Sequence, residues 1–137
     1  MKVEIADLKR RYVDEKNEIL KCVKNVLKSG NLILSDKNKS FENSICKLTK
    51  SKYCLGLNSG TDALMMALWS VGIEKNDEVI TSPISFIATS NSIVHVGAKP
   101  VFVDVDDDLN LNPNLIEKAI TKKTKAIIPV HLYGQAC

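Results

Sequence analysis

The first fifty residues carry the pattern of two helices. Between Arg11 and Lys28 apolar side chains recur every three or four positions, and the pattern stops at Ser29-Gly30, a common way for a helix to end. A second helix is expected from Asp36 to Lys50, with Ser35 placed to cap its start. Its apolar positions are Phe41, Ile45 and Leu48. We therefore expect residues 1–50 to form a helical arm whose first helix buries one face.

After residue 50, short apolar runs alternate with helical patterns. The alternation predicts four strands, which are Tyr53–Leu57, Glu78–Thr81, Pro100–Asp104 and Lys125–Val130. The order of strands and helices predicts an α/β fold, with a mostly parallel sheet and helices on both faces. The run at Pro100–Asp104 is continuously apolar, which is typical of a strand covered on both sides.

Three helices are expected between and after these strands. The helix at Ala63–Val71 is apolar over nearly its whole circumference, which indicates packing on several sides. A second helix is expected at Ser85–Val96. A third begins after Asn112, which can cap it, with Pro113 in the first position. Its inward-facing residues are expected to be Leu115, Ile116, Ala119 and Ile120.

The sequence stops at Cys137, seven residues after the fourth predicted strand. No helix follows to cover that strand. We therefore expect residues 51–137 to be an incomplete α/β domain, truncated after its fourth strand.

Composition narrows the class of protein. Hydrophobic residues make up 45% of the chain and charged residues 26%, as in an ordinary soluble domain. The net charge of +3 is scattered and aromatic residues are only 5%, so nucleic acid is not an expected partner. No apolar run could span a membrane, and the charged segment Met1–Asp7 does not resemble a secretion signal. A cytoplasmic location follows as an expectation.

Ligands of open α/β sheets bind beyond the carboxyl ends of the strands, where this sequence places distinctive residues. The segment Asn58-Ser59-Gly60-Thr61 lies between a predicted strand and a helix. Its hydroxyls, its glycine and the free N–H groups of the helix start could bind an anion. An ordinary helix cap, in which Ser59 or Thr61 satisfies the backbone, is about equally favoured from these four residues alone.

Two further residues lie near the same end of the sheet. Phe86 could stack on a planar ligand, although an aromatic residue near a helix start is more often part of a core. His131 could act as an acid, a base or a hydrogen-bond donor, or could be a satisfied histidine at the end of a strand. The acidic stretch Asp104–Asp108 could suggest magnesium, but a solvated loop is favoured, and no metal site is expected because the cysteine spacing fits none.

Four segments together resemble the DegT/DnrJ/StrS family of sugar aminotransferases. These segments are Asn58–Leu64, Asp77–Pro83, Ser85–Thr89 with Gly97–Asp104, and Thr124–Gln135. The resemblance implies the N-terminal part of a fold-type-I pyridoxal-phosphate enzyme. It also implies a homodimer that transfers an amino group, usually from glutamate, to a keto group of a nucleotide-linked sugar, often for polysaccharide biosynthesis.

The resemblance also implies roles for individual residues. Gly60 and Thr61 would bind the cofactor phosphate, with Ser59 shaping the turn, Phe86 would lie against the pyridine ring, and His131 would lie beneath or beside the cofactor. The family's aspartate and Schiff-base lysine are expected after Cys137. No catalytic residue is therefore expected in residues 1–137, and the chain alone is expected to be inactive.

Two alternatives remain open. A sugar dehydratase of the same family uses pyridoxamine phosphate and has histidine in place of the Schiff-base lysine. A non-catalytic binding or regulatory module could also retain the phosphate site. Residues after Cys137 would decide between these possibilities.

Overall fold

The computed structural model describes residues 6–137 and divides the chain into two compact units. One unit ends at Gly56, and the other spans Leu57–Cys137. Most of the charged segment Met1–Asp7, on which the expected location rests, lies outside the described residues. Within residues 6–137, no helix has the length and apolar character needed to cross a membrane.

The first unit consists of two helices, α1 (Leu8–Ser29) and α2 (Asp36–Thr49). Asp7 caps α1, because its carboxylate accepts a hydrogen bond from the Arg10 amide at 2.9 Å. Gly30 ends α1 in a left-handed conformation with φ of 67°, and its amide donates to the Leu27 carbonyl. The two predicted helices are therefore present, and the first begins three residues earlier than expected.

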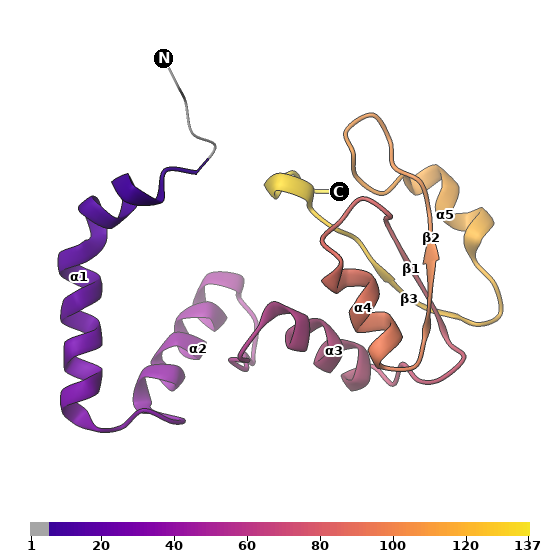
Figure 1. Ribbon diagram of the computed structural model, residues 1–137. Coiled ribbons are helices and arrows are strands. Elements are labelled where there is room, and N and C mark those ends of the chain that lie inside the picture. The colour runs from indigo at the N-terminus through magenta and orange to yellow at the C-terminus, as the bar shows by residue number, and fades with distance from the viewer. Residues whose placement is uncertain (1–5) are drawn as a thin grey trace, which may run out of the picture. The chain divides into compact units, whose positions relative to one another are not determined.

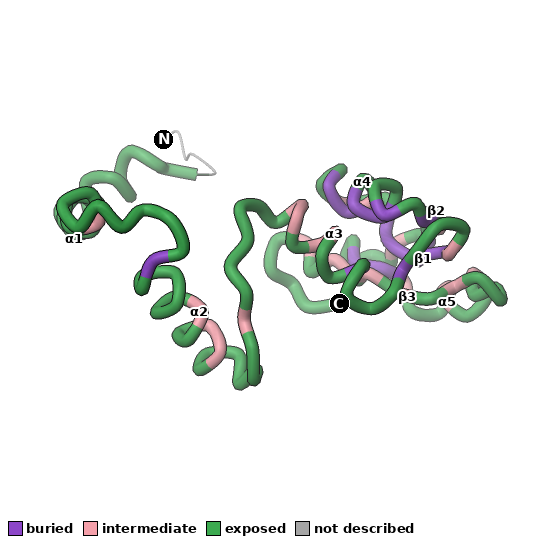
Figure 2. The backbone as a smooth tube through the Cα atoms, turned by 90° about the horizontal axis from the view of Figure 1, so that it is seen from below, coloured by how far each residue is buried: buried purple, intermediate pink, exposed green. Residues whose placement is uncertain are grey.

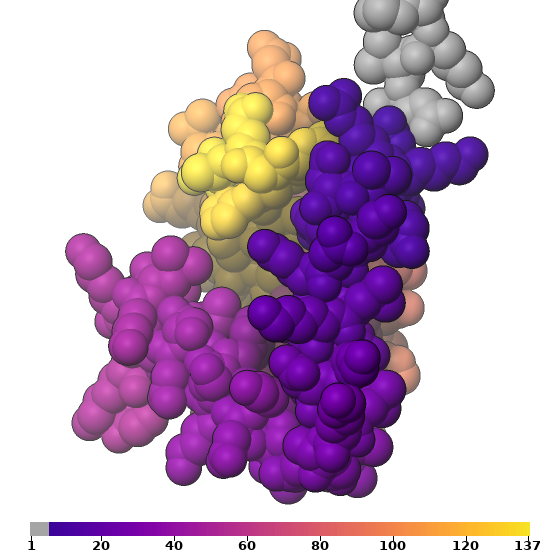
Figure 3. Space-filling model, turned by 90° about the vertical axis from the view of Figure 1, so that its left-hand side faces the viewer, coloured from indigo at the N-terminus to yellow at the C-terminus, as the bar shows by residue number. Residues whose placement is uncertain are grey.

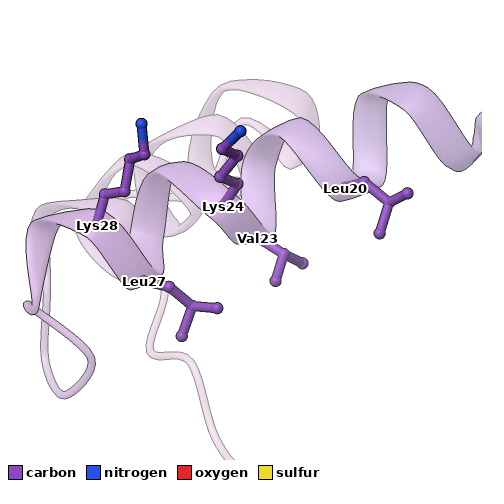
Figure 4. A pocket seen from close by; sticks show the side chains of 5 residues that line it. All are labelled: Leu20, Val23, Lys24, Leu27 and Lys28. Carbon is purple, nitrogen blue, oxygen red and sulfur yellow. The ribbon is translucent and has the colours of Figure 1, made fainter.

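The expected buried face of α1 is exposed. Leu20, Val23 and Leu27 project from the same side of the helix, whereas Lys24 and Lys28 project from the other (Figure 4). The three apolar side chains are 56%, 49% and 63% exposed. Side chains of α1 protrude along its whole length in the space-filling view (Figure 3). Periodicity predicted the helix correctly, but burial also requires a surface against which to pack.

The second helix differs from expectation in the same way. Phe41 and Leu48 are exposed, and no residue of α2 is buried. Ser35 stands at the N-cap, but its hydroxyl makes no capping hydrogen bond, so that prediction was wrong. Its carbonyl accepts instead from the amides of Asn38 and Lys39. Ser35 is buried at 7% exposure, whereas most of the tube of this unit is green in the burial colouring (Figure 2).

The predicted strand at Tyr53–Leu57 does not form. Tyr53 is 78% exposed and Leu55 is 75% exposed, and neither belongs to a sheet. A strand needs a neighbour to satisfy its backbone, and no described residue pairs with this segment. The segment is tied to the first unit by a hydrogen bond of 2.8 Å from the Gly56 amide to the Glu42 carboxylate and by one of 3.2 Å from the Ser51 hydroxyl to the Tyr53 carbonyl.

The second unit contains a parallel sheet of three strands, β1 (Glu78–Thr81), β2 (Lys99–Phe102) and β3 (Thr124–Ile128). The strand order is β2-β1-β3, so β1 is central and each connection crosses over between parallel strands. The parallel sheet was predicted correctly, with three strands in place of four. Figure 1 shows the three strands beside one another.

Helices cover both faces of this sheet, as expected. Side chains alternate along β1, so Val79 and Ile80, both fully buried, belong to different clusters. Val79 packs with Leu68 of α3 (Gly60–Ser70) and Ile93 of α4 (Ala88–His95). On the other face, Ile80 packs with residues of α5 (Pro113–Ala119), which are Leu115, Ile116 and Ala119.

Several details of this unit correct the sequence predictions. Met66 and Trp69 are both 48% exposed and Leu68 is the buried residue of α3, so α3 is not packed on several sides. Ile120 follows α5 and is 53% exposed, so it does not face inward. Phe102 is 54% exposed because β2 lies at the edge of the three-stranded sheet. The Asn112 cap and Pro113 at the start of α5 are confirmed.

Candidate functional site

The carboxyl ends of β1 and β3 are joined by a partly buried hydrogen bond. Thr81, the last residue of β1, donates from its hydroxyl to the Ile128 carbonyl at 3.0 Å. Thr81 is fully buried, so its end of this bond is shielded from water. The bond fixes the point from which the loops after β1 and β3 leave the sheet.

These loops and the start of α3 border an open cavity of about 450 Å³. Its lining comes from three segments of the second unit, which are residues 60–64 at the start of α3, 85–89 before and within α4, and 130–133 after β3. The predicted residues Gly60, Thr61, Phe86 and His131 all line this cavity. Ser59, the fifth predicted residue, does not.

Ser59 caps α3 with both its side chain and its backbone carbonyl. Its hydroxyl accepts from the Asp62 amide at 3.1 Å and donates to the Asp62 carboxylate at 2.8 Å. Its carbonyl accepts from the Ala63 amide, the first bond of the helix. Of the two interpretations left open by the sequence, the helix cap therefore describes Ser59.

The next two residues fit the other interpretation, an anion site. The amides of Gly60 and Thr61 find no acceptor among residues 6–137. They are the first two amides of α3, where the helix dipole favours negative charge. Both residues line the cavity, so these two donors are available to a ligand there.

Gly60 is not required by the fold of the chain itself. Its φ lies outside the left-handed region, and a Cβ built on it meets no atom within 4 Å. An alanine would therefore fit at this position and would favour the helix slightly. The benefit of glycine here is the open space beside two free amides, which suits close approach of a phosphate.

Phe86 is not a core residue. Its side chain is 76% exposed, and its carbonyl accepts a hydrogen bond from the Thr89 amide at 3.0 Å just before α4. The hydroxyls of Ser85 and Thr89 lie 2.8 Å apart in the same wall of the cavity. The wall therefore offers one aromatic face and two hydroxyls to a ligand.

His131 has one of its ring nitrogens occupied. The Cys137 amide donates to Nδ1 at 3.1 Å. An imidazole nitrogen that accepts a hydrogen bond carries no proton, so the neutral ring carries its proton on Nε2. His131 is therefore a bonded histidine at its Nδ1 atom, as one of the two interpretations expected. Its Nε2 atom has no partner among the described residues.

Sequence reasoning missed several residues of the cavity. Ser85, Thr89 and Tyr133 lie within the segments that carry the family resemblance, so those motifs could have identified them. Tyr133 is 98% exposed and has a φ of 53°, which is unusual for a residue other than glycine. Thr81 also lies within one of those segments, but its hydrogen bond to the Ile128 carbonyl could not be read from the sequence pattern.

The charged groups around the cavity are few. No lysine or arginine is among the residues that line it, as the structure describes them. Asp104, Asp106, Asp107 and Asp108 are exposed, and residues 6–137 contain no cluster that could hold a metal ion. The aspartates of this loop are therefore exposed to solvent, as the sequence predicted. A bound anion would therefore be held by uncharged donors, such as the first amides of α3, and by the dipole of that helix.

Comparison with known proteins connects this site to a family. Residues 13–137 match the sequence model of the DegT/DnrJ/EryC1/StrS aminotransferase family. The pleiotropic regulatory protein of Geobacillus stearothermophilus is 45% identical over 136 residues, which are 98% of this chain and 37% of that protein. A UDP-2-acetamido-2-deoxy-3-oxo-D-glucuronate aminotransferase of Pseudomonas aeruginosa is 41% identical over 134 residues, 97% of this chain and 37% of that protein.

A solved structure is similar over the same extent. The crystal structure of S. venezuelae DesV in complex with a ketimine intermediate is 38% identical, with a TM-score of 0.94. The match covers 98% of this chain and 37% of DesV, so this chain spans about a third of the length of the proteins it matches. Family model, sequence relatives and fold agree: the chain belongs to the DegT/DnrJ/EryC1/StrS aminotransferase family.

Proposed function

We propose that the full-length protein transfers an amino group from an amino-acid donor, expected to be glutamate, to a keto group of a nucleotide-linked sugar. Pyridoxal phosphate is the proposed cofactor. The observation that carries the proposal is the cavity at the carboxyl end of the sheet, where two free amides, an exposed phenyl ring and His131 meet. The family membership and the substrate named for the Pseudomonas relative support the same reaction.

The phosphate of the cofactor is proposed to bind at Gly60 and Thr61. Their amides lack acceptors within the described chain and lie at the positive end of the α3 dipole. The Thr61 side chain is half-buried, and its hydroxyl can add a third donor. Ser59 would keep this turn in shape through its bonds to Asp62.

The aromatic and imidazole groups are proposed to hold the ring of the cofactor. Phe86 is exposed on the cavity wall and offers a flat apolar face. His131 can donate a hydrogen bond from Nε2, because Nδ1 is occupied by the Cys137 amide. Together they would orient a planar ligand between the walls of the cavity.

The covalent chemistry is proposed to lie outside these 137 residues. When bound, pyridoxal phosphate supplies an electron sink for the carbon that exchanges the amino group. No lysine lines the cavity in the part of the chain that the structure describes. We therefore propose that the Schiff-base lysine and its companion aspartate are contributed by later residues, in a homodimeric protein. The cytoplasmic location stays a prediction, to be tested by cell fractionation.

A regulatory role is a second candidate, because one relative is named a pleiotropic regulatory protein. Such a role would use the same cavity for ligand binding without transfer of an amino group. Turnover separates the two candidates. The full-length protein, incubated with glutamate and a nucleotide-linked keto sugar, should yield an amino sugar in the first case and bind without turnover in the second.

The test of the site is the affinity of the full-length protein for pyridoxal phosphate. Gly60→Val should lower this affinity about tenfold or more, worth roughly 1.4 kcal/mol, because side-chain atoms would occupy the space beside the two amides. Gly60→Ala should have a smaller effect in the same direction. Gly60→Ala should fold normally, since a Cβ at Gly60 meets nothing within 4 Å. Thermal unfolding of the cofactor-free protein checks that Gly60→Val is correctly folded.

The matched control is Gly56→Ala in the first unit. Gly56 also lacks a left-handed φ, and a Cβ there makes only an ordinary contact of 3.5 Å with Glu42. This variant should bind the cofactor as the wild type does. Unchanged affinity in a correctly folded Gly60→Val protein would count against the phosphate site.

A further inference from the structure

A buried asparagine links the loop after β2 to the cavity wall after β3. Asn110 is 3% exposed, and its side-chain oxygen accepts from the Leu132 amide at 3.3 Å. The same amide also donates to the Val130 carbonyl within the turn, at 3.0 Å. The Asn110 oxygen lies 3.5 Å from the thiol of Cys137, which also donates to the Val130 carbonyl at 3.0 Å. The partners of Asn110 lie 22 and 27 positions further along the chain. The loop after β2 and the final segment lie at the same end of the sheet (Figure 1).

Asp108 fixes the orientation of this asparagine. One carboxylate oxygen accepts from the backbone N–H of Asn110 at 3.0 Å, and the other accepts from the side-chain nitrogen of Asn110 at 3.0 Å. The second oxygen also accepts from the side-chain nitrogen of Gln135 at 3.2 Å. A carboxylate can only accept, so the Asn110 nitrogen must face Asp108 and its oxygen must face Leu132.

Asp108 is charged in this arrangement. The hydrogen bonds from the side chain and the backbone of Asn110, with a further one from Gln135, hold the pKa of Asp108 below its ordinary value. Hydrogen bonds to an ionised acceptor are stronger than neutral ones. Asp108 and Asn110 therefore form a directed pair, and we call these two residues the Asp108–Asn110 clamp.

The segment held by the clamp forms one wall of the cavity. Leu132–Gly134 is a single tight turn, within which Tyr133 has a left-handed φ of 53°. Such a backbone conformation persists when surrounding bonds hold it in place. His131, Leu132 and Tyr133 all line the cavity, so the clamp bonds directly to the backbone of this wall.

We propose that the Asp108–Asn110 clamp is a positioning device for the cofactor cavity, which holds the turn at 131–133 so that His131 and Tyr133 face the ligand. Neither clamp residue is among those that line the cavity. The ligand in this proposal rests on the proposed function. The role of the clamp in fixing the backbone at Leu132 does not depend on the identity of the ligand.

The test exchanges the two side chains of the clamp in the full-length protein. Asn110→Asp keeps the oxygen that faces Leu132 but places a second carboxylate against Asp108. Asp108→Asn alone keeps the shape but leaves too few acceptors for Asn110 and Gln135. The double variant Asp108→Asn with Asn110→Asp restores one carboxylate and one amide with their roles exchanged. Asn114→Asp is the control, because Asn114 is exposed on α5 and its side chain makes no hydrogen bond in the described chain.

Two quantities are measured for each variant. Hydrogen exchange of the Leu132 amide in the cofactor-free protein reports the turn, and titration with pyridoxal phosphate reports the cavity. Each single variant should speed exchange at Leu132 and lower the cofactor affinity about tenfold, as expected for a broken charge-assisted pair. The double variant should recover both to within about threefold, and the control should match the wild type.

Three outcomes would overturn the proposal. The first is wild-type exchange at Leu132 in both single variants, and the second is a double variant as impaired as the singles. The third is faster exchange at Leu132 with unchanged cofactor affinity, which would mean that the clamp holds the turn without serving the cavity. If the wild type itself binds no cofactor, the proposed function fails, and the hold on Leu132 is still decided by the exchange rates. Asp108 is exposed, so Asp108→Asn should fold even if Asn110→Asp does not.

Discussion

The two units of the chain follow their sequence patterns to different extents. In the first unit the helices form where periodicity places them, yet no residue of α1 or α2 is buried. In the second unit Val79, Ile80 and Ile93 are fully buried between helices and sheet. Figure 2 shows the contrast, with green along the first unit and purple around β1 and α4. Helix formation is thus a local property, whereas burial depends on which surfaces the chain itself supplies.

The second unit can stabilise its own fold, whereas the first unit leaves apolar surface available for contact with other parts of the protein or other chains. The second unit contains its own two hydrophobic clusters and also the candidate cofactor cavity. The first unit presents apolar side chains, including Leu20, Val23 and Leu27, to solvent. We expect perturbations of the second unit to affect folding and cofactor binding, and perturbations of the first to affect association.

The largest expected effect concerns the 137-residue chain as a whole. Expressed by itself, it should have no aminotransferase activity, because no lysine lines its described cavity. It should also self-associate, because both edges of the three-stranded sheet and many apolar side chains are exposed. Size-exclusion chromatography and proton NMR measure the association. A dispersed monomeric spectrum, with an imine absorbance abolished by mutating one lysine, would contradict both expectations.

The next effect compares one apolar residue from each unit. Ile93→Ala should lower the free energy of unfolding of the 137-residue chain by about 2 to 5 kcal/mol, because Ile93 is fully buried. Leu27→Ala, at 63% exposure, should change it by less than about 0.5 kcal/mol. Denaturant unfolding of both variants makes the measurement.

The same pair of variants in the full-length protein sharpens the comparison. A larger cost of Leu27→Ala there would show that other parts of the protein cover α1. Equal costs of Ile93→Ala and Leu27→Ala in the 137-residue chain would contradict the contrast between the two units.

A smaller effect is expected at Phe86. In the full-length protein Phe86→Ala should weaken cofactor binding by about 1 to 3 kcal/mol if the ring stacks, by analogy with base stacking. Unfolding of the cofactor-free protein should change little, since Phe86 is 76% exposed. Phe41→Ala in α2, at 57% exposure, is the matched control and should leave binding intact. A loss of stability without a loss of binding would identify Phe86 as a packing residue instead.

The smallest effect is a pH dependence of the second unit. Thr121 donates to the Glu78 carboxylate at 2.6 Å, and Lys99 lies 3.6 Å from it, so the pKa of Glu78 is held below its ordinary 4.5. A lowered pKa stabilises the fold above pH 4.5, and this contribution is lost as the pH falls through the folded value.

Thermal unfolding measured from pH 7 down to pH 3 tests this contribution. The unfolding temperature should fall less with decreasing pH in Glu78→Gln than in the wild type. Glu117→Gln, at an exposed position of α5, should behave as the wild type does. Identical pH profiles for wild type and Glu78→Gln would show that the bonds to Thr121 and Lys99 contribute no pH-dependent stability.

Much of the fold could be predicted because it depends on local signals. The bounds of β1, the cap at Asn112 and the crossover order followed from short apolar runs and turn residues. The strand at Tyr53–Leu57 could not be judged in this way, because a strand forms only with a neighbour and none is among the described residues. The exposed face of α1 has the same cause.

The residues of the site likewise differ in whether local sequence could identify them. Gly60, Thr61, Phe86 and His131 were found because motifs lie directly after predicted strands, and the structure brings all four to one cavity. Their binding roles stay predictions. Thr81 and Asn110 were missed, because each acts through hydrogen bonds to residues more than twenty positions away. Sequence spacing alone does not encode such contacts.

The most direct test of the central claim is a crystal structure of the full-length protein with pyridoxal phosphate. We expect phosphate oxygens within hydrogen-bonding distance of the Gly60 and Thr61 amides, with the pyridine ring against Phe86 and beside His131. A cofactor phosphate bound elsewhere, with those two amides facing solvent or bonded to protein, would contradict this expectation.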